Sequence, residues 1–374
     1  MEEWKEYKLG DVCTISSSKR IFASEYQNKG IPFYRGKEII EKQNGSKISN
    51  ELFISENRYN EIKSRYGAPK EGDMLLSSVG TLGVPYVVQN EAFYFKDGNL
   101  TWFYDFQGIN NYFLYYWFLS PKARFLVDTK AIGSTQKALT IETLKKFDIS
   151  LPPIDTQKNI VAILKSLDDK IEVNRRINDN LEQQAMAIFD MMFPAVASGE
   201  DVIGNIIIPK RGKGLLSKDA VEGNVPVVAG GLEPATYHNE SNTVAPVVTI
   251  SASGANAGFV NLWQIPVWSS DSSFIDASMT ENVYFWYVML KKRQKEIFDA
   301  QTGSAQPHIY PKHIAEMPMG NFEQSDVEKF TEIVTPMFEI RGRNLKESER
   351  LASLRDTLLP KLMSGELKLN EINV

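Results

Sequence analysis

The run GSTQKALTIETLKKFDISLPP, residues 133–153, is echoed later in the chain by GSAQPHIYPKHIAEMPMGNF, residues 303–322. The two runs begin 170 positions apart, and each leads into a long segment with many charged and regularly spaced apolar residues. With that offset held, the alignment continues without gaps for about 60 residues and places Asn174 on Asn344. A repeat that keeps its register over such a length predicts two copies of one structural plan.

The two long segments that follow these runs carry a heptad-like pattern of apolar residues. The spacing alternates between four and three residues from Ile160 to Met192, and it is less regular from Phe330 to Leu362. Such spacing predicts helices that pair along a seam, with Asn174 and Asn344 fixing the register. We expect an antiparallel pair, and the alternative is that each helix packs only on its neighbouring domain. The predicted contact residues are Leu164, Leu167, Ile171, Asn174, Leu181, Ile188, Val334, Met337, Asn344, Leu351 and Leu358.

Local signals at both ends of these segments predict where the helices begin and stop. Pro152 and Pro153 precede Asp155, which we expect to be the N-cap of the first helix. Ser325 or Asp326 is expected to cap the second helix. Ser364-Gly365, after Leu359-Pro360, is typical of a helix end.

The segments before the two helices also resemble each other, though less closely. LLSSVGTLGVPYVV at 75–88 and VTISASGANAGFVNL at 248–262 each read as a strand, a glycine turn and a second strand. We therefore expect an α+β protein with two small strand-rich α/β domains, separated by two long helices that form an antiparallel coiled coil with pseudo-two-fold symmetry. The expected boundaries are 1–150 for the first domain, 151–194 for the central helix, 195–322 for the second domain, and 323–374 for the C-terminal helix and tail.

Composition limits the classes of protein to which the chain can belong. With 374 residues, the chain is long enough for more than one domain, and its single cysteine, Cys13, excludes a disulfide framework. The acidic, polar start has no secretory signal, so we expect a cytoplasmic protein. The net charge of −5 and the absence of a strongly basic region argue mildly against nucleic-acid binding, unless local clusters or partners supply positive charge.

A catalytic site is not apparent in the sequence. The three histidines, His238, His308 and His313, all lie in the second half and form a poor metal-binding set. No phosphate-binding loop or hydrolase nucleophile motif is present. The glycine-rich runs SVGTLG and SGANAG lie between strand-like segments, which favours tight turns over phosphate binding. We therefore predict no catalytic, cofactor or metal site in this chain.

Basic residues mixed with aromatic and amide side chains recur in both domains. Lys and Arg bind phosphates, and Arg, Asn and Gln read base edges. Any one of these residues is more simply explained as solvated surface charge, but the Lys-Arg pairs near the start of each domain are stronger candidates. The DNA-binding candidates are Lys19, Arg20, Arg35, Lys37, Arg58, Lys63, Arg65, Lys210, Arg211, Lys213 and Lys218.

The chain resembles the specificity subunit of type I restriction–modification systems over essentially its whole length. The resemblance lies in two domains that are each followed by a Gly-Ser-x-Gln loop and a long helix, in LPPIDTQKNIVAILKSLDDKIEVNRRINDNLE at 151–182, and in LRDTLLPKLMSGEL at 354–367. It implies that each domain reads one half of a bipartite, asymmetric site on double-stranded DNA. It also implies that the helices form a spacer that binds two modification (methyltransferase) subunits, joined by nuclease-translocase subunits.

The same resemblance implies a non-catalytic subunit, with S-adenosylmethionine, ATP and Mg²⁺ bound by the partners. The repeated loops are interpreted as hinges where a recognition domain ends and its spacer begins; a direct contact of the glutamines with DNA or a partner is the less favoured alternative. Two rival functions remain: a self-contained methyltransferase or nuclease, and a coiled-coil adaptor without DNA specificity. The hinge residues are Gly133, Ser134, Gln136, Gly303, Ser304 and Gln306.

Overall fold

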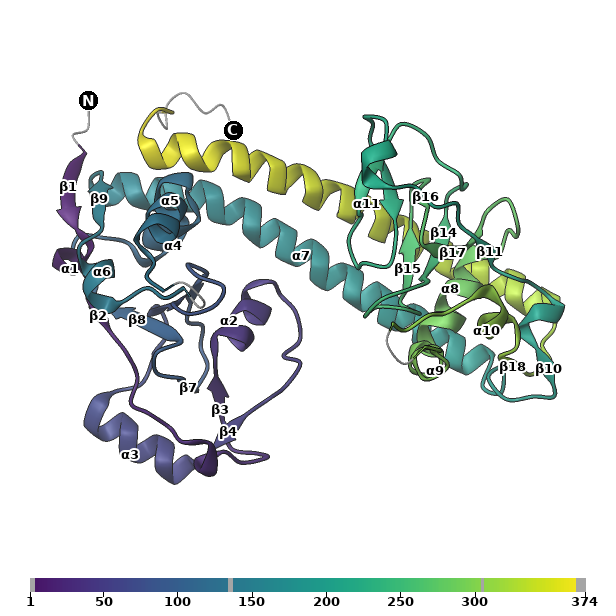
Figure 1. The fold of residues 1–374 in the computed structure, drawn as a ribbon, viewed down its shortest axis with the longest axis horizontal. Coiled ribbons are helices and arrows are strands. Elements are labelled where there is room, and N and C mark those ends of the chain that lie inside the picture. Colours follow the sequence, from purple (N-terminus) through teal and green to yellow (C-terminus); the bar gives the residue numbers. More distant parts are fainter. Residues whose placement is uncertain (1–3, 134–136, 304–305, 368–374) are drawn as a thin grey trace. The chain divides into compact units, whose positions relative to one another are not determined.

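The computed structural model describes residues 4–133, 137–303 and 306–367. The chain divides into two compact units (Figure 1). Unit 1 comprises Met1–Glu172 with Arg350–Val374, and unit 2 comprises Val173–Glu349. Each unit therefore takes part of both long helices, because these helices pass from one unit into the other.

Unit 1 contains two sheets packed with short helices, and a small strand pair at its chain ends. The larger sheet has the strand order β2-β8-β5-β6, and the smaller has β4-β3-β7, while β1 pairs with β9. The elements are β1 Lys5–Lys8, α1 Leu9–Val12, β2 Thr14–Ser16, β3 Ile31–Tyr34, α2 Gly36–Gln43, β4 Phe53–Ile54, α3 Glu56–Tyr66, β5 Met74–Ser77, β6 Pro85–Val87, β7 Tyr94–Phe95, β8 Leu100–Tyr104, α4 Asn111–Leu119, α5 Pro121–Lys130, α6 Ile141–Lys145 and β9 Asp148–Leu151.

Unit 2 repeats this topology strand for strand. Its larger sheet has the order β11-β17-β14-β15, its smaller sheet has β13-β12-β16, and β10 pairs with β18. These orders confirm that the chain repeats one domain plan. The elements are β10 Asp201–Val202, β11 Lys210–Arg211, β12 Val225–Val228, β13 Thr236–His238, β14 Val247–Ser251, β15 Val260–Trp263, β16 Trp268–Ser269, β17 Ser272–Asp276, α8 Val283–Lys292, α9 Gln294–Asp299, α10 Pro311–Ala315 and β18 Pro318–Met319.

The two long helices are α7, Ile154–Met192, and α11, Gln324–Ser364. Both begin slightly earlier than the capping signals predicted, so Asp155 lies in the first turn of α7 instead of at its N-cap. A carboxylate there is favourable because the first turn carries unpaired N–H groups and the positive end of the helix dipole. Gly365 has φ 73° just after α11, the left-handed conformation that ends helices.

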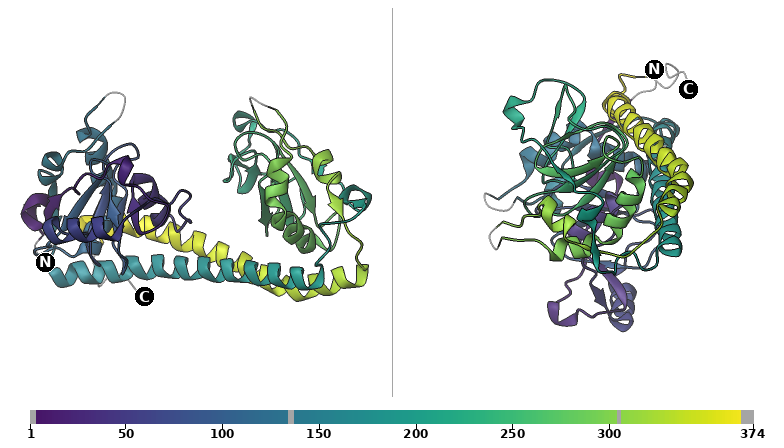
Figure 2. Two further views of the ribbon diagram at one scale, coloured as in Figure 1. Left: turned by 90° about the horizontal axis from the view of Figure 1, so that it is seen from below. Right: turned by 90° about the vertical axis from the view of Figure 1, so that its right-hand side faces the viewer.

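The helices run antiparallel within each unit (Figure 2). In unit 1, Leu164 of α7 shares a buried core with Leu359 and Leu362 of α11. In unit 2, the Phe189 ring of α7 lies 5.5 Å from the Phe330 ring of α11. Residue numbers that rise along one helix therefore meet falling numbers along the other, which is the expected antiparallel direction. The pseudo-two-fold symmetry stays a prediction.

A short apolar helix connects the sheets of each unit to the long helices. In unit 1 this helix is α4, whose N-cap Asn110 accepts a hydrogen bond from the Phe113 amide at 3.1 Å. Ser120 then ends α4 and caps α5, so this helical segment is divided in two. The corresponding segment of unit 2 is divided at Arg293 into α8 and α9. Large buried aromatic side chains on α4 and α8 fill the two main cores.

Candidate nucleic-acid interface

The two Lys-Arg pairs that the sequence singled out occupy corresponding places in the two units. Lys19-Arg20 follows β2, and Lys210-Arg211 forms β11. Both strands lie at the edge of the larger sheet of their unit, next to β8 and β17 respectively. The repeated topology therefore presents a basic pair at the same sheet edge twice.

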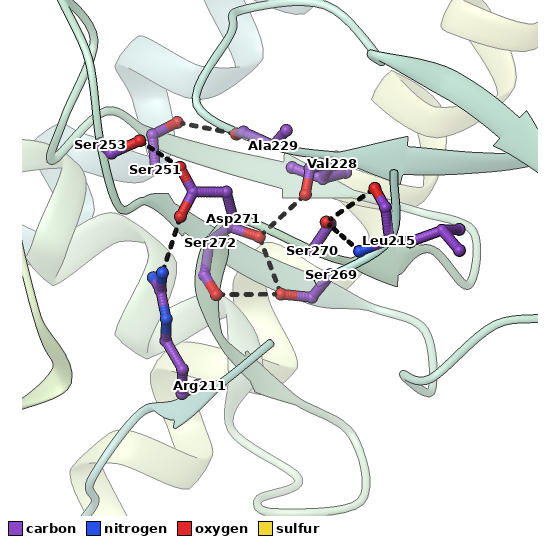
Figure 3. A network of polar contacts seen from close by, with 10 residues as sticks. All are labelled: Arg211, Leu215, Val228, Ala229, Ser251, Ser253, Ser269, Ser270, Asp271 and Ser272. Atoms are coloured by element: carbon purple, nitrogen blue, oxygen red, sulfur yellow. Dashed lines mark hydrogen bonds and ion pairs between the residues drawn. The ribbon is translucent and has the colours of Figure 1, made fainter. Parts of the chain in front are cut away.

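Each arginine of these pairs is held by an aspartate from a distant part of the chain. Arg20 Nε lies 2.8 Å from Asp97 Oδ2, and Arg211 Nη2 lies 2.6 Å from Asp271 Oδ1 (Figure 3). Asp97 lies between β7 and β8, and Asp271 lies between β16 and β17, so the two aspartates also correspond. Neither arginine is thus a simple solvated charge.

The lysine candidates differ in their surroundings. Lys210 and Lys218 are exposed, and Lys218 lies in the 3₁₀ turn Ser217–Asp219. Three of the other four have their ammonium groups over aromatic rings, a cation–π arrangement that fixes a flexible side chain. The distances from Nζ to ring centroid are 4.5 Å for Lys19 and Tyr66, 5.5 Å for Lys63 and Tyr59, and 5.9 Å for Lys213 and Trp268.

The remaining candidates lie at or on α2 and α3 of unit 1, and each has a carboxylate partner. Hydrogen bonds with Glu38 raise the pKa of Arg35, and hydrogen bonds with Glu61 raise the pKa of Arg58, so both guanidiniums stay charged. The surface is therefore mixed in sign, with little net positive charge. The pairs are Arg35–Glu38 at 3.1 Å, Lys37–Glu41 at 3.7 Å, Arg58–Glu25 at 2.7 Å, Arg58–Glu61 at 2.9 Å and Arg65–Glu61 at 3.5 Å.

Tyr26 marks the place where several of these charges gather. Burial raises the pKa of its hydroxyl, the positive charge of Arg35 opposes that rise, and Asp97 adds to it. The Tyr26 ring also lies 5.2 Å from the Phe33 ring of β3. Charged side chains from several segments of unit 1 therefore act on the hydroxyl of Tyr26.

The repeated Gly-Ser-x-Gln loops do not lie where the hinge interpretation put them. In unit 1 the bridge Ile132↔Ala138 closes the loop, and Ala138 also bridges Val79 beyond β5. Helix α6 and strand β9 then separate the loop from α7, and α10 and β18 separate its counterpart from α11. Gly133, Gly303 and Gln306 are exposed and lie between bridged residues of the same domain. Ser134, Gln136 and Ser304 lie outside the described residues.

The histidines have structural surroundings. His238 Nδ1 accepts a hydrogen bond from the Val221 amide at 3.0 Å, and His313 Nδ1 accepts one from the Tyr310 amide at 3.3 Å. His308 forms backbone bridges with Ser253 and Thr302. Within residues 4–133, 137–303 and 306–367, no cluster of His, Cys, Asp and Glu side chains is arranged to hold a metal ion. In the same ranges no helix has the length and apolar character needed to cross a membrane.

Known proteins with similar sequences include type I restriction enzyme specificity subunits. Residues 1–183 match the family model described as the type I restriction modification DNA specificity domain. A type I restriction enzyme specificity subunit of Methanocaldococcus jannaschii, MjaIX, is 25% identical over 99% of this chain and 95% of its own. Residues 1–183 thus match a type I specificity domain, and the chain as a whole is similar to a type I specificity subunit.

Further relatives agree with that assignment. A Haemophilus influenzae protein that also carries a type I specificity-subunit name is 36% identical over 170 residues, which span 45% of this chain and 40% of that protein. The crystal structure of the type I system S subunit from M. genitalium superposes with a TM-score of 0.59 at 20% identity and covers 96% of both chains. Specificity subunits are the non-catalytic components of their systems, in agreement with the prediction made from the missing motifs.

In the pair of long helices, each predicted contact residue is buried or partly buried. Near the middle of the helices, Asn174 Nδ2 donates to Ser348 Oγ at 3.3 Å and to Glu347 Oε2 at 2.8 Å. Asn344 Nδ2 donates to Asn178 Oδ1 at 2.9 Å. The two asparagines that the repeat aligned therefore each have a polar partner on the opposite helix. Such pairs penalise sliding of one helix past the other, because a shift would leave buried amides unpaired.

Two aromatic residues beside the basic pairs were not predicted as part of the site. Tyr94 and Trp268 begin β7 and β16, and each contacts the basic segment beside it. A signal was present in the sequence, because each stands three residues before the corresponding aspartate, Asp97 or Asp271. That signal is weak without the structure, since aromatic residues are frequent in strands.

Proposed function

We propose that the chain is the DNA-reading subunit of a type I restriction–modification complex, and that each unit reads one half of a bipartite, asymmetric site. The observation that carries the proposal is the duplicated strand order, with a basic pair at the same sheet edge of both units. The side chains around those pairs differ, since Tyr94 in unit 1 corresponds to Trp268 in unit 2. The two units share one fold but differ in these side chains, so each unit would read a different half-site.

The charge distribution supports a subunit that binds DNA tightly only within a complex. Phosphate contacts by free Lys and Arg dominate the affinity of most DNA-binding proteins. Here the net charge is −5, and most candidate arginines are paired with carboxylates. Partner subunits would therefore supply much of the phosphate binding, and this chain would supply base recognition.

The long helices are the proposed binding surface for two methyltransferase subunits. Both helices expose apolar side chains at positions where a helix facing only water usually has polar ones. Examples are Val173 and Ile177 of α7 and Leu345 of α11. Val173 and Ile177 are four residues apart and lie on one helix face. Nuclease-translocase subunits would join this core in the cytoplasm, with S-adenosylmethionine, ATP and Mg²⁺ bound by the partners.

Selection from a pool of random DNA duplexes tests this proposal. The full chain is produced with and without its methyltransferase subunits, and bound duplexes are sequenced after several rounds. We expect the assembled complex to enrich two short, unlike half-sites at a constant separation, and the chain alone to bind more weakly. If the assembled complex enriches no sequence, DNA reading is wrong, and the coiled-coil adaptor remains as the function.

A further inference from the structure

The same four-residue device is present in both units. In unit 1 it is Tyr94 to Asp97, and in unit 2 it is Trp268 to Asp271, with the aromatic residue first and the aspartate last. Each device spans the connection from the smaller sheet to the larger one, after β7 or β16 begins and before β8 or β17. It therefore leads in each unit into the strand that pairs with the edge strand, β2 or β11.

The aromatic residue of each device holds the backbone of the basic segment. The Tyr94 hydroxyl accepts a hydrogen bond from the Lys19 amide at 2.8 Å. Trp268 Nε1 donates to the Lys213 carbonyl at 2.8 Å. The donor and acceptor are exchanged between the units, but in each case a ring at the same strand position fixes the backbone beside an arginine.

The aspartate of each device holds the arginine side chain itself. In unit 1 the Arg20 side chain is 69% exposed and Asp97 only 18% exposed, so the aspartate is the recessed partner. Asp271 is further fixed by a hydrogen bond from Ser253 Oγ, and Ser270 Oγ accepts from the Leu215 amide at 2.9 Å (Figure 3). In unit 1 the carboxylate is thus the recessed member and the guanidinium the exposed one; in unit 2 the two side chains are similarly exposed, Arg211 at 42% and Asp271 at 37%.

A guanidinium held on one side keeps hydrogen-bond donors for a second partner. Asp97 contacts Nε of Arg20, and a guanidinium has five N–H donors in a rigid fork. An ion-paired arginine contributes little net charge to attract phosphates, but its plane is fixed, which favours bidentate pairing with a flat acceptor pair. The O6 and N7 atoms of guanine in the major groove are the acceptor pair that arginine contacts most often.

We propose that Arg20 and Arg211 each read a guanine edge, one in each half-site, and that Asp97 and Asp271 are positioning residues that orient them. Tyr94 and Trp268 fix the backbone that carries these arginines. This inference rests on the proposed function, because it assigns the residues that read bases within it.

The test measures duplex binding by the assembled complex with matched variants of each unit. The sequence enriched by the wild type is compared with duplexes changed at each guanine. Arg20→Ala should weaken binding to the enriched sequence by about 5- to 150-fold and abolish the preference at one guanine of one half-site. Arg20→Lys should not restore that preference, because lysine lacks the fork. Asp97→Asn should reduce the same preference by about threefold or more. Arg211→Ala and Asp271→Asn should act only on the other half-site.

Two exposed aspartates that pair with lysines elsewhere provide charge-matched controls. Asp148→Asn, beside Lys8, and Asp299→Asn, beside Lys295, should leave every base preference unchanged. If Arg20→Ala weakens all duplexes equally, or Arg20→Lys restores binding, the arginine contacts phosphate and the inference is overturned. If the wild type enriches a motif that all variants retain, the inference fails while the proposed function stands. If the wild type enriches no motif, both fail.

Discussion

Arg355 of α11 donates from Nη1 to Asp168 Oδ1 of α7 at 2.7 Å, in the part of the helix pair that belongs to unit 1. The other carboxylate oxygen of Asp168 accepts a hydrogen bond from the Tyr116 hydroxyl of α4 at 2.7 Å. One carboxylate therefore joins three helices. Burial opposes the charged form of Arg355, but hydrogen bonds to Asp168 and Asp356 outweigh it and raise the pKa of the guanidinium. The side chains of both Arg355 and Asp168 are about three-quarters buried.

Replacing this carboxylate should destabilise unit 1. Asp168→Ala leaves a largely buried guanidinium with only Asp356 and removes the partner of Tyr116, so we expect the free energy of unfolding to fall by about 2 kcal/mol. The neighbouring Asp169 pairs with Lys165 on the exposed side of α7. Asp169→Ala should therefore cost less than about 0.5 kcal/mol. Urea unfolding of the two variants checks the difference, and equal losses would contradict the assigned role of Asp168.

The glycine-rich turns offer a second paired test. Gly254 and Gly258 both have positive φ, at 81° and 87°. A Cβ on Gly258 would lie 2.8 Å from Ile297 Cγ2, whereas one on Gly254 meets nothing within 4 Å. Gly254→Ala should cost about 1 kcal/mol from backbone strain alone. Gly258→Ala should cost about 2 to 3 kcal/mol because overpacking is added. Thermal unfolding measures both, and the reverse order would show that the turn is arranged differently.

Cys13 is a probe of unit 1 because it is the one cysteine in the sequence and lies in the core. Burial raises the pKa of its thiol from 9.0 to about 12. At pH 8 the native thiol should therefore react with a disulfide reagent about a thousandfold more slowly than in urea, where it is exposed. A native rate equal to the rate in urea would show that the core around Cys13 is open.

The same shift sets the direction of a pH effect on stability. Below pH 9 the thiol is neutral in both states, so its contribution to stability is fully present. Between pH 9 and about 12 the unfolded thiol ionises while the native one does not. The free energy of unfolding should thus fall with pH in that window, by up to about 1.4 kcal/mol per pH unit. Cys13→Ala should lack this component, and urea unfolding of both proteins at pH 8 and pH 10 measures it.

The proposed function predicts that the long helices set the separation of the half-sites. The unit boundaries in the sequence follow Glu172 of α7 and Glu349 of α11. Inserting four residues at each of these two positions lengthens each helix by about 6 Å. Duplex selection should return the same half-sites with a changed gap. A four-residue insertion between α2 and β4, in an exposed connection, should leave the gap unchanged. Recovery of the original gap from the lengthened helices would refute this prediction.

Much of the architecture could be predicted because it depends on patterns within short stretches of sequence. The offset of 170 residues preserved its register through both long helices, and the strand–glycine–strand runs recurred before them. Heptad spacing depends only on neighbours within two turns, so α7 and α11 were predicted within a few residues of their ends. The position of the Gly-Ser-x-Gln loops was misjudged, because α6 and β9 are short elements with weak periodicity.

The sequence by itself determined that this protein contains two copies of one domain plan and two long helices whose apolar spacing favours pairing. Only the tertiary structure decided which basic residues have partners. Arg20 and Asp97 are 77 positions apart, and Arg211 and Asp271 are 60 apart, so no local pattern connects them. They meet because the connection from the smaller sheet to the larger one passes beside the chain that follows β2 in unit 1 and beside β11 in unit 2. Sheet topology, which depends on long-range strand pairing, therefore places each of these arginines next to its aspartate.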